Sequence, residues 1–188
     1  DNGITDLLLQ PGDEVTAEEA PDLARHGIMI DASFEYHPAI DLDSTLLAHG
    51  DSALGYVLHF VAGHPTLSVF LNGNVTAIRL DAIPDGPTHL RALIDGAGVM
   101  SLAIPGRGEI LSEAPFPLGF PAKPKAGIRV AESFGVLSPK GYPNSTPFDG
   151  PIQRLRLTIM PEGQSIVLPA LPVPDAQPPG AAPTTEQK

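Results

Sequence analysis

Short hydrophobic runs separated by Gly, Pro, Asn or Asp recur along the chain from Ile28 to about residue 160. The turn residues return about every eight to twelve positions, which is typical of a β-sandwich or barrel. The pattern predicts strands at 27–36, 45–49, 55–62, 66–72, 75–80, 88–95, 99–104, 109–113, 126–132 and 151–159.

Alternation within these runs predicts which side chains face a core. In 66–72, Leu67, Val69 and Leu71 alternate with Ser68 and Phe70, so one set points inward and the other outward. By the same parity Tyr56, Leu58 and Phe60 point inward. Asn72-Gly73 accepts the positive φ of a tight turn and predicts a hairpin over 66–80, and Asp95–Gly98 predicts a second turn.

Composition limits the fold to one β-rich domain. The 22 prolines and 19 glycines are too many for a helix bundle, while 42% hydrophobic residues in 188 positions are enough for one core. We expect a β-sandwich domain at 21–172, preceded by an acidic, solvated segment at 1–20 and followed by a Pro-rich extended tail at 173–188.

Charge and cysteine content exclude several classes of partner and site. The formal charge of -11 disfavours nucleic acid, and no apolar run is long enough to span a membrane. The absence of cysteine excludes disulfides, thiolate zinc sites and a cysteine nucleophile. We expect a secreted or periplasmic bacterial protein whose signal peptide is not present in this chain.

Catalytic motifs are missing, so we expect no enzyme activity. A retaining glycosidase on a curved sandwich needs carboxylates that alternate along a strand, and Asp41-Leu42-Asp43 is the only alternating pair. There is no Gly-x-Ser-x-Gly turn, and the six histidines show no metal-binding spacing. No cofactor is certain. Calcium is possible at Asp51, Asp95 or Asp149, although a turn-forming role suits each of them better.

Several segments, in order, resemble a known family. They are Leu46–Gly50 before Gly55–Phe60, Thr88–Ala92 leading to Asp95-Gly96, and Phe148–Leu155. Together they resemble the laminin G-like, concanavalin A-type jelly roll, in which a Phe-x-Gly-x-Ile segment leads into the last strand. The resemblance implies an all-β fold of two antiparallel sheets and a noncatalytic carbohydrate-binding or protein-interaction module.

A closer likeness is to the C-terminal sandwich of large bacterial arylsulfatases. It rests on Ala20–Ile30 before the first strand and on Gly127–Ala131 before the closing one. The chain departs from the pattern at Pro151, has no tryptophan and lacks the sulfatase Cys/Ser-x-Pro-x-Arg motif. The likeness implies an accessory domain, so the alternative function is structural packing on a sulfatase-like hydrolase.

Parity also predicts a binding face. If the hydrophobic positions point inward, a second set of side chains points outward: His59, Phe70, Arg79, His89 and Arg91. We expect this set to form one concave face that binds a glycan or a partner protein domain. The ring would stack on a sugar, and the arginines would bind an anionic substituent. The alternative is that a loop such as 115–124 covers Phe70 and that the arginines pair with acids.

Overall fold

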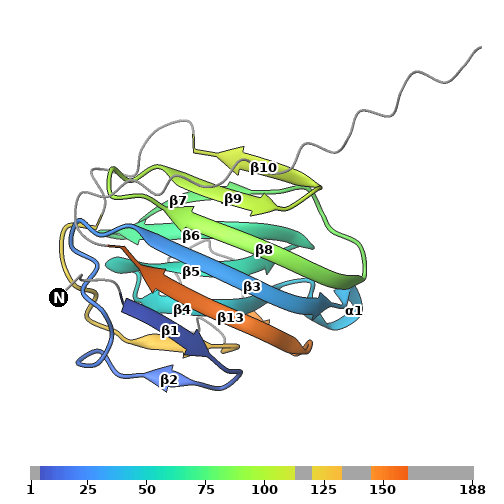
Figure 1. Ribbon diagram of the computed structural model, residues 1–188, viewed down its shortest axis with the longest axis horizontal. Helices are drawn as coiled ribbons and strands as arrows, with labels where there is room; N and C mark the ends of the chain where they lie inside the picture. Colours follow the sequence, from blue (N-terminus) through green and yellow to red (C-terminus); the bar gives the residue numbers. More distant parts are fainter. Residues whose placement is uncertain (1–4, 113–119, 133–144, 161–188) are drawn as a thin grey trace, which may run out of the picture.

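The computed structural model describes residues 5–112, 120–132 and 145–160 of the chain, which form two packed β-sheets (Figure 1). The front sheet has the strand order β1 (Thr5–Leu9), β13 (Ile152–Ile159), β3 (Ile28–Tyr36), β8 (Gly86–Ile94), β9 (Met100–Ile104) and β10 (Gly108–Leu111). The back sheet has the order β2 (Glu14–Val15), β11 (Ile128–Val130), β4 (Ser44–Gly50), β5 (Leu54–Val61), β6 (His64–Leu71) and β7 (Asn74–Arg79).

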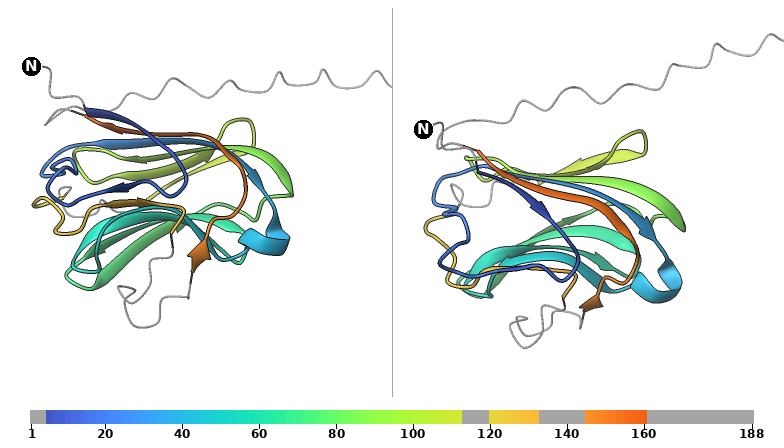
Figure 2. Two further views of the ribbon diagram at one scale, coloured as in Figure 1. Left: turned by 90° about the horizontal axis from the view of Figure 1, so that it is seen from below. Right: turned by 60° about the horizontal axis from the view of Figure 1, so that its bottom comes forward.

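The two sheets lie as separate layers with the core between them (Figure 2). Neighbouring strands along both sheets pair antiparallel, and the two-residue β12 (Thr146–Pro147) adds a short parallel pairing to β4. One short helix, α1 (Pro38–Asp41), follows β3. The expected class, an all-β antiparallel two-sheet sandwich of the jelly-roll type, is confirmed.

Local turn chemistry explains the predicted hairpins. β6 and β7 pair from Leu71↔Asn74 onward, and both turn residues have positive φ, 52° at Asn72 and 79° at Gly73. The turn at Asp95–Gly98 joins β8 to β9 in the same way, with Gly98 at φ 88°. Both hairpin predictions are therefore confirmed.

Alternation places the large apolar side chains between the sheets. β3 alternates strictly between buried and half-buried positions. The predicted inward residues of β5 and β6 lie in the core, five of them buried and Leu71 partly buried at the margin. Aromatic rings join the layers, because Phe60 of the back sheet stacks on Tyr36 of the front sheet at 4.6 Å between ring centroids and contacts Phe34 edge-on at 5.7 Å.

The N-terminal segment differs from the prediction of a solvated acidic stretch. β1 pairs with β13 and β2 pairs with β11, so each sheet takes an edge strand from it. Leu9 is buried in the core, and a turn closed by the Ala20 N–H and the Thr16 carbonyl follows β2. The apolar run of β1 is short, and its partner lies about 150 residues away, so local pattern alone did not reveal it.

Two predicted segments lie partly or wholly outside the described residues. Of the expected crossover loop at 114–124, residues 120–124 are described, and Phe120 packs in the core against Tyr56 at 5.9 Å between ring centroids. The expected tail at 173–188 lies wholly outside the described residues.

Candidate functional site

The structure divides the five predicted site residues between two sheets. All five point away from the core, as parity predicts, because their neighbours along each strand lie in it. His59, Phe70 and Arg79 belong to the back sheet, whereas His89 and Arg91 belong to β8 of the front sheet. The chain crosses between the sheets after β7, so the two groups lie on opposite sides of the sandwich. The prediction of one common face is wrong.

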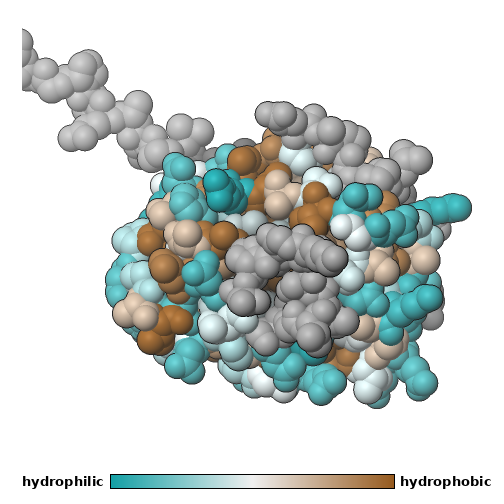
Figure 3. All heavy atoms as spheres, turned by 180° about the vertical axis from the view of Figure 1, so that it is seen from behind, coloured by the Kyte–Doolittle hydropathy of each residue, from teal (hydrophilic) through white to brown (hydrophobic). Residues whose placement is uncertain are grey.

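Two of the back-sheet residues are not accessible. Phe70 is 0% exposed and His59 is 1% exposed. Phe70 packs with Ala48 and Val57 in a small second hydrophobic cluster. The segment expected to cover Phe70, 115–124, is described only in part. Viewed onto the back sheet, hydrophobic residues occur in several small patches among hydrophilic ones (Figure 3).

His59 also forms a buried polar pair on this side of the back sheet. Its Nε2 atom lies 2.9 Å from Ser68 Oγ, a distance suited to a serine nucleophile and its base. Burial lowers the pKa of His59 to about 4, which makes it a weak base, and both side chains are almost fully buried. Because solutes do not reach the pair, we interpret it as a structural hydrogen bond.

The outer side of the front sheet gathers charged side chains from three strands. Register places Arg156 of β13, Asp31 of β3 and Arg91 of β8 side by side in one row across the sheet. The adjacent row contains Arg154 of β13, Ser33 of β3 and His89 of β8. We call this set the arginine face: Asp31, Ser33, His89, Arg91, Arg154 and Arg156.

Asp31 organises the arginine face from its centre. Its Oδ1 atom lies 2.7 Å from His89 Nε2 and 3.5 Å from Arg91 Nε. The His89 side chain is 46% exposed and the Arg91 side chain 21% exposed, so both remain accessible. Asp31 is hydrogen-bonded to His89 and attracts the Arg91 guanidinium by charge. The face therefore presents ordered donors and acceptors to solvent.

Sequence reasoning missed four residues of this face: Asp31, Ser33, Arg154 and Arg156. Their signal is present as alternation, since the two arginines of β13 are separated by the buried Leu155. Recognising the face, however, requires knowing that β13 and β8 both pair with β3. That pairing joins segments far apart in the sequence.

A hollow of about 490 Å³ adjoins the arginine face beside β1, lined by Asp6, Leu8, Gln153, Arg154 and Arg156. Arg156 Nε donates to Asp6 Oδ1 at 2.7 Å, and its Nη2 donates to the other oxygen of the same carboxylate. These hydrogen bonds hold the pKa of Asp6 below its usual value. The hollow thus contains one paired guanidinium, Arg156, and a second one, Arg154.

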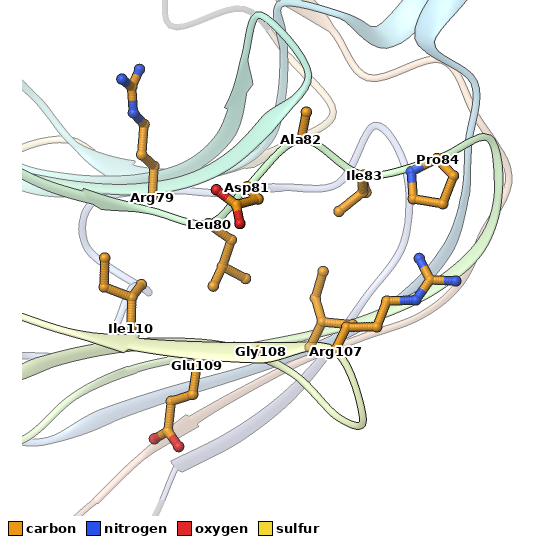
Figure 4. A pocket seen from close by; sticks show the side chains of 11 residues that line it. Arg79, Leu80, Asp81, Ala82, Ile83, Pro84, Arg107, Gly108, Glu109 and Ile110 are labelled. Atoms are coloured by element: carbon orange, nitrogen blue, oxygen red, sulfur yellow. The ribbon is translucent and has the colours of Figure 1, made fainter.

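A groove of about 320 Å³ opens at the other edge of the sandwich, between β7 and β10. Leu80, Ile83 and Ile110 extend into it, while Arg79 and Glu109 point away (Figure 4). Arg79, the remaining predicted site residue, therefore borders an apolar groove on a different part of the molecule from the arginine face.

Two of the three candidate calcium ligands, Asp51 and Asp95, form hydrogen bonds within their own turns. Asp51 Oδ1 accepts the Ala53 N–H at 2.9 Å, and Asp95 Oδ1 accepts the Ala97 N–H at 2.9 Å. Across the described ranges, no group of three or more His, Asp or Glu side chains is arranged to hold a metal ion. No helix in the same ranges is long and apolar enough to cross a membrane.

Comparisons with known proteins give structural likeness alone. No protein-family model and no curated protein sequence matches the chain. The binding domain of botulinum neurotoxin serotype C1 matches with TM-score 0.42 and 9% identity over 84% of this chain and 42% of that chain. A galectin of Caenorhabditis elegans matches with TM-score 0.34 and 10% identity, over 66% of this chain and 91% of the galectin chain.

An alginate lyase of Pseudomonas aeruginosa matches with TM-score 0.34 and 14% identity, over 79% of this chain and 71% of the lyase chain. Compared with the botulinum toxin binding domain, this chain spans about two fifths of that chain's length.

Proposed function

We propose that the protein is a noncatalytic carbohydrate-binding β-sandwich module and that the sugar lies on the arginine face. The observation that carries this proposal is the accessible cluster in which Asp31 holds His89 and Arg91 in place. Sugar hydroxyls both donate and accept hydrogen bonds, so they match a surface that offers guanidinium, imidazole and carboxylate groups together.

Binding on this face depends on hydrogen bonds instead of ring stacking. Every Phe and Tyr that the structure describes is buried, including Phe70, so none of these rings is available to a sugar. The side chains of the arginine face come from adjacent strands of one sheet, which fixes their spacing. A rigid set of donors and acceptors loses little conformational entropy when a ligand binds.

A glycan array followed by calorimetric titration with the best-binding sugar tests the proposal. We expect His89→Ala and Arg91→Ala each to weaken binding about tenfold or more, because each removes a donor worth about 1.5–3 kcal/mol. Lys125→Ala is the control, since it removes an exposed positive charge just before β11, a strand of the back sheet. Absence of glycan binding by the folded protein, or equal binding by all three variants, would contradict the proposal.

The finer assignments rest on sequence resemblance. The likeness to laminin G-like domains and to the arylsulfatase sandwich supports a noncatalytic accessory role in an exported bacterial protein. A test is expression of the full gene with its native start, followed by fractionation of the cells. Recovery in the cytoplasm would contradict export.

The second candidate function is structural packing on a sulfatase-like hydrolase. The apolar groove between β7 and β10 favours it, because Leu80, Ile83 and Ile110 offer a surface that a partner domain would cover. We expect Ile83→Asp to abolish co-elution with a sulfatase-like hydrolase that is encoded by a neighbouring gene and produced as a separate chain. Co-elution that persists in this variant would remove the groove from consideration.

A further inference from the structure

Arg154 is an exposed arginine that makes no direct ion pair among the described residues, because the nearby Asp6 carboxylate is already hydrogen-bonded to Arg156. It lies on β13 opposite Ser33 of β3, and its side chain borders the hollow beside β1. With respect to the residues that the structure describes, its guanidinium forms neither a salt bridge nor a hydrogen bond. In a chain with a net charge of -11, an arginine that stays unpaired is available to a ligand.

Arg156 is held next to it in a fixed orientation. Two of its nitrogens, Nε and Nη2, donate to the Asp6 carboxylate. The third nitrogen, Nη1, is not used in that contact and can donate to a ligand. The hollow has two guanidinium groups and one carboxylate, so its local charge is positive. The negative charges elsewhere on the chain are screened over about 8 Å at physiological ionic strength.

The other walls of the hollow restrict the kind of anion that fits. Leu8 is 67% exposed and presents an apolar surface beside the cations, and Gln153 contributes an amide that both donates and accepts hydrogen bonds. A sugar ring has C–H groups that pack on an apolar side chain and hydroxyls that bond to an amide. The volume of about 490 Å³ lies in the usual range for small-molecule sites.

We propose that this hollow is a subsite for an acidic sugar residue, whose carboxylate or sulfate oxygens accept hydrogen bonds from Arg154 and from Arg156 while its ring packs against Leu8. The inference rests on the proposed function, since it names the class of sugar bound at the edge of the arginine face. The planar donors of Arg154 suit a bidentate contact with an oxyanion.

Titration calorimetry with matched probes tests the acidic-sugar subsite. The probes are trigalacturonate, its fully methyl-esterified and therefore neutral form, a sulfated disaccharide and pentaglutamate. We expect the wild-type protein to bind trigalacturonate or the sulfated disaccharide at least tenfold more tightly than the ester and than pentaglutamate. Comparing trigalacturonate with the sulfated disaccharide distinguishes a carboxylate from a sulfate as the preferred group.

Variants locate the preference for charge in the hollow. Arg154→Gln is expected to reduce the preference for the acid over the ester at least fivefold, while Arg154→Lys retains part of it because it keeps the charge without the planar fork. Lys125→Ala is the control for loss of one exposed positive charge. Thermal unfolding of each variant verifies that it is folded.

Three outcomes would overturn the inference. They are equal binding of ester and acid, an unchanged preference in Arg154→Gln, and binding of pentaglutamate as tight as that of the sugar. In each of these cases, a neutral glycan that still binds the arginine face leaves the proposed function intact. If no glycan of any kind binds the folded protein, the inference and the proposed function both fail.

Discussion

The carboxylate of Asp41 accepts a 2.8 Å hydrogen bond from the backbone N–H of Asp149, which lies 108 residues further along the chain. Asp41 is fully buried at the end of α1, and the segment it holds leads into β13. The fit there is tight, because a Cβ atom at Gly150 would overlap the carbonyl oxygen of Glu35. This contact anchors the entry to the last strand.

Replacing Asp41 is therefore expected to weaken the fold. Asp41→Ala leaves the partly buried N–H of Asp149 without its acceptor, and we expect a loss of about 1–3 kcal/mol in the free energy of unfolding. Asp41→Asn keeps an acceptor oxygen and should cost less. Urea denaturation of both variants at pH 7 measures the difference in unfolding free energy. Equal stability of the two variants would contradict the prediction.

Two buried histidines predict a loss of stability in acid. Burial lowers the pKa of both His49 and His59 from 6.5 to about 4, so the unfolded chain binds protons in a range where the folded protein does not. Their contribution is present above pH 6.5 and is lost as the pH falls toward 4, by up to roughly 3 kcal/mol for each group.

The matched variants for this prediction are His49→Gln and His59→Gln. Each is expected to flatten the decrease in unfolding free energy between pH 6.5 and pH 4.5, measured from urea midpoints at several pH values. His89→Gln is the comparison, because the His89 side chain is 46% exposed whereas His49 and His59 are buried. A wild-type pH dependence in both buried-site variants would show the prediction to be incorrect.

Phe70 should behave as a packing residue. Because it is 0% exposed and packs with Ala48 and Val57, we expect Phe70→Ala to reduce stability by about 3 kcal/mol. Val75→Ala on the neighbouring strand changes a residue that is 39% exposed, and it should cost less than about 1 kcal/mol. Weaker glycan binding by Phe70→Ala at unchanged stability would instead support the original stacking hypothesis.

Truncation after Pro172 tests the predicted tail, which lies outside the described residues. The removed segment is rich in proline and poor in large apolar side chains. We expect the Tm to change by less than about 4 °C. A larger decrease in a thermal melt would mean that residues beyond 172 contribute to the folded domain.

Much of the fold could be predicted because its signals are local. Asn72-Gly73 specifies a tight turn by its own conformational preference, and the alternation of Leu67 and Val69 with Ser68 specifies which side is buried. The strand β1 escaped prediction because Thr5–Leu9 is short and pairs with β13, which lies about 150 residues further along the chain.

The candidate site could be predicted only in part because it depends on pairings between distant segments. Parity correctly placed His89 and Arg91 on an outer surface, but it could not show that Arg79 lies in the other sheet. The arginines of β13 join β8 only through β3, so no local pattern reveals that they are neighbours.

The position of β13 between β1 and β3 has a consequence for synthesis on the ribosome. Asp6 is synthesised 150 residues before its partner Arg156. Until that strand arrives, β1 has no neighbour in the front sheet, and the row from Arg156 to Arg91 is missing its first member. A nascent chain that ends before β13 would therefore lack two of the six residues of the arginine face and three of the five that line the hollow, so the hollow would form only after β13 has been made.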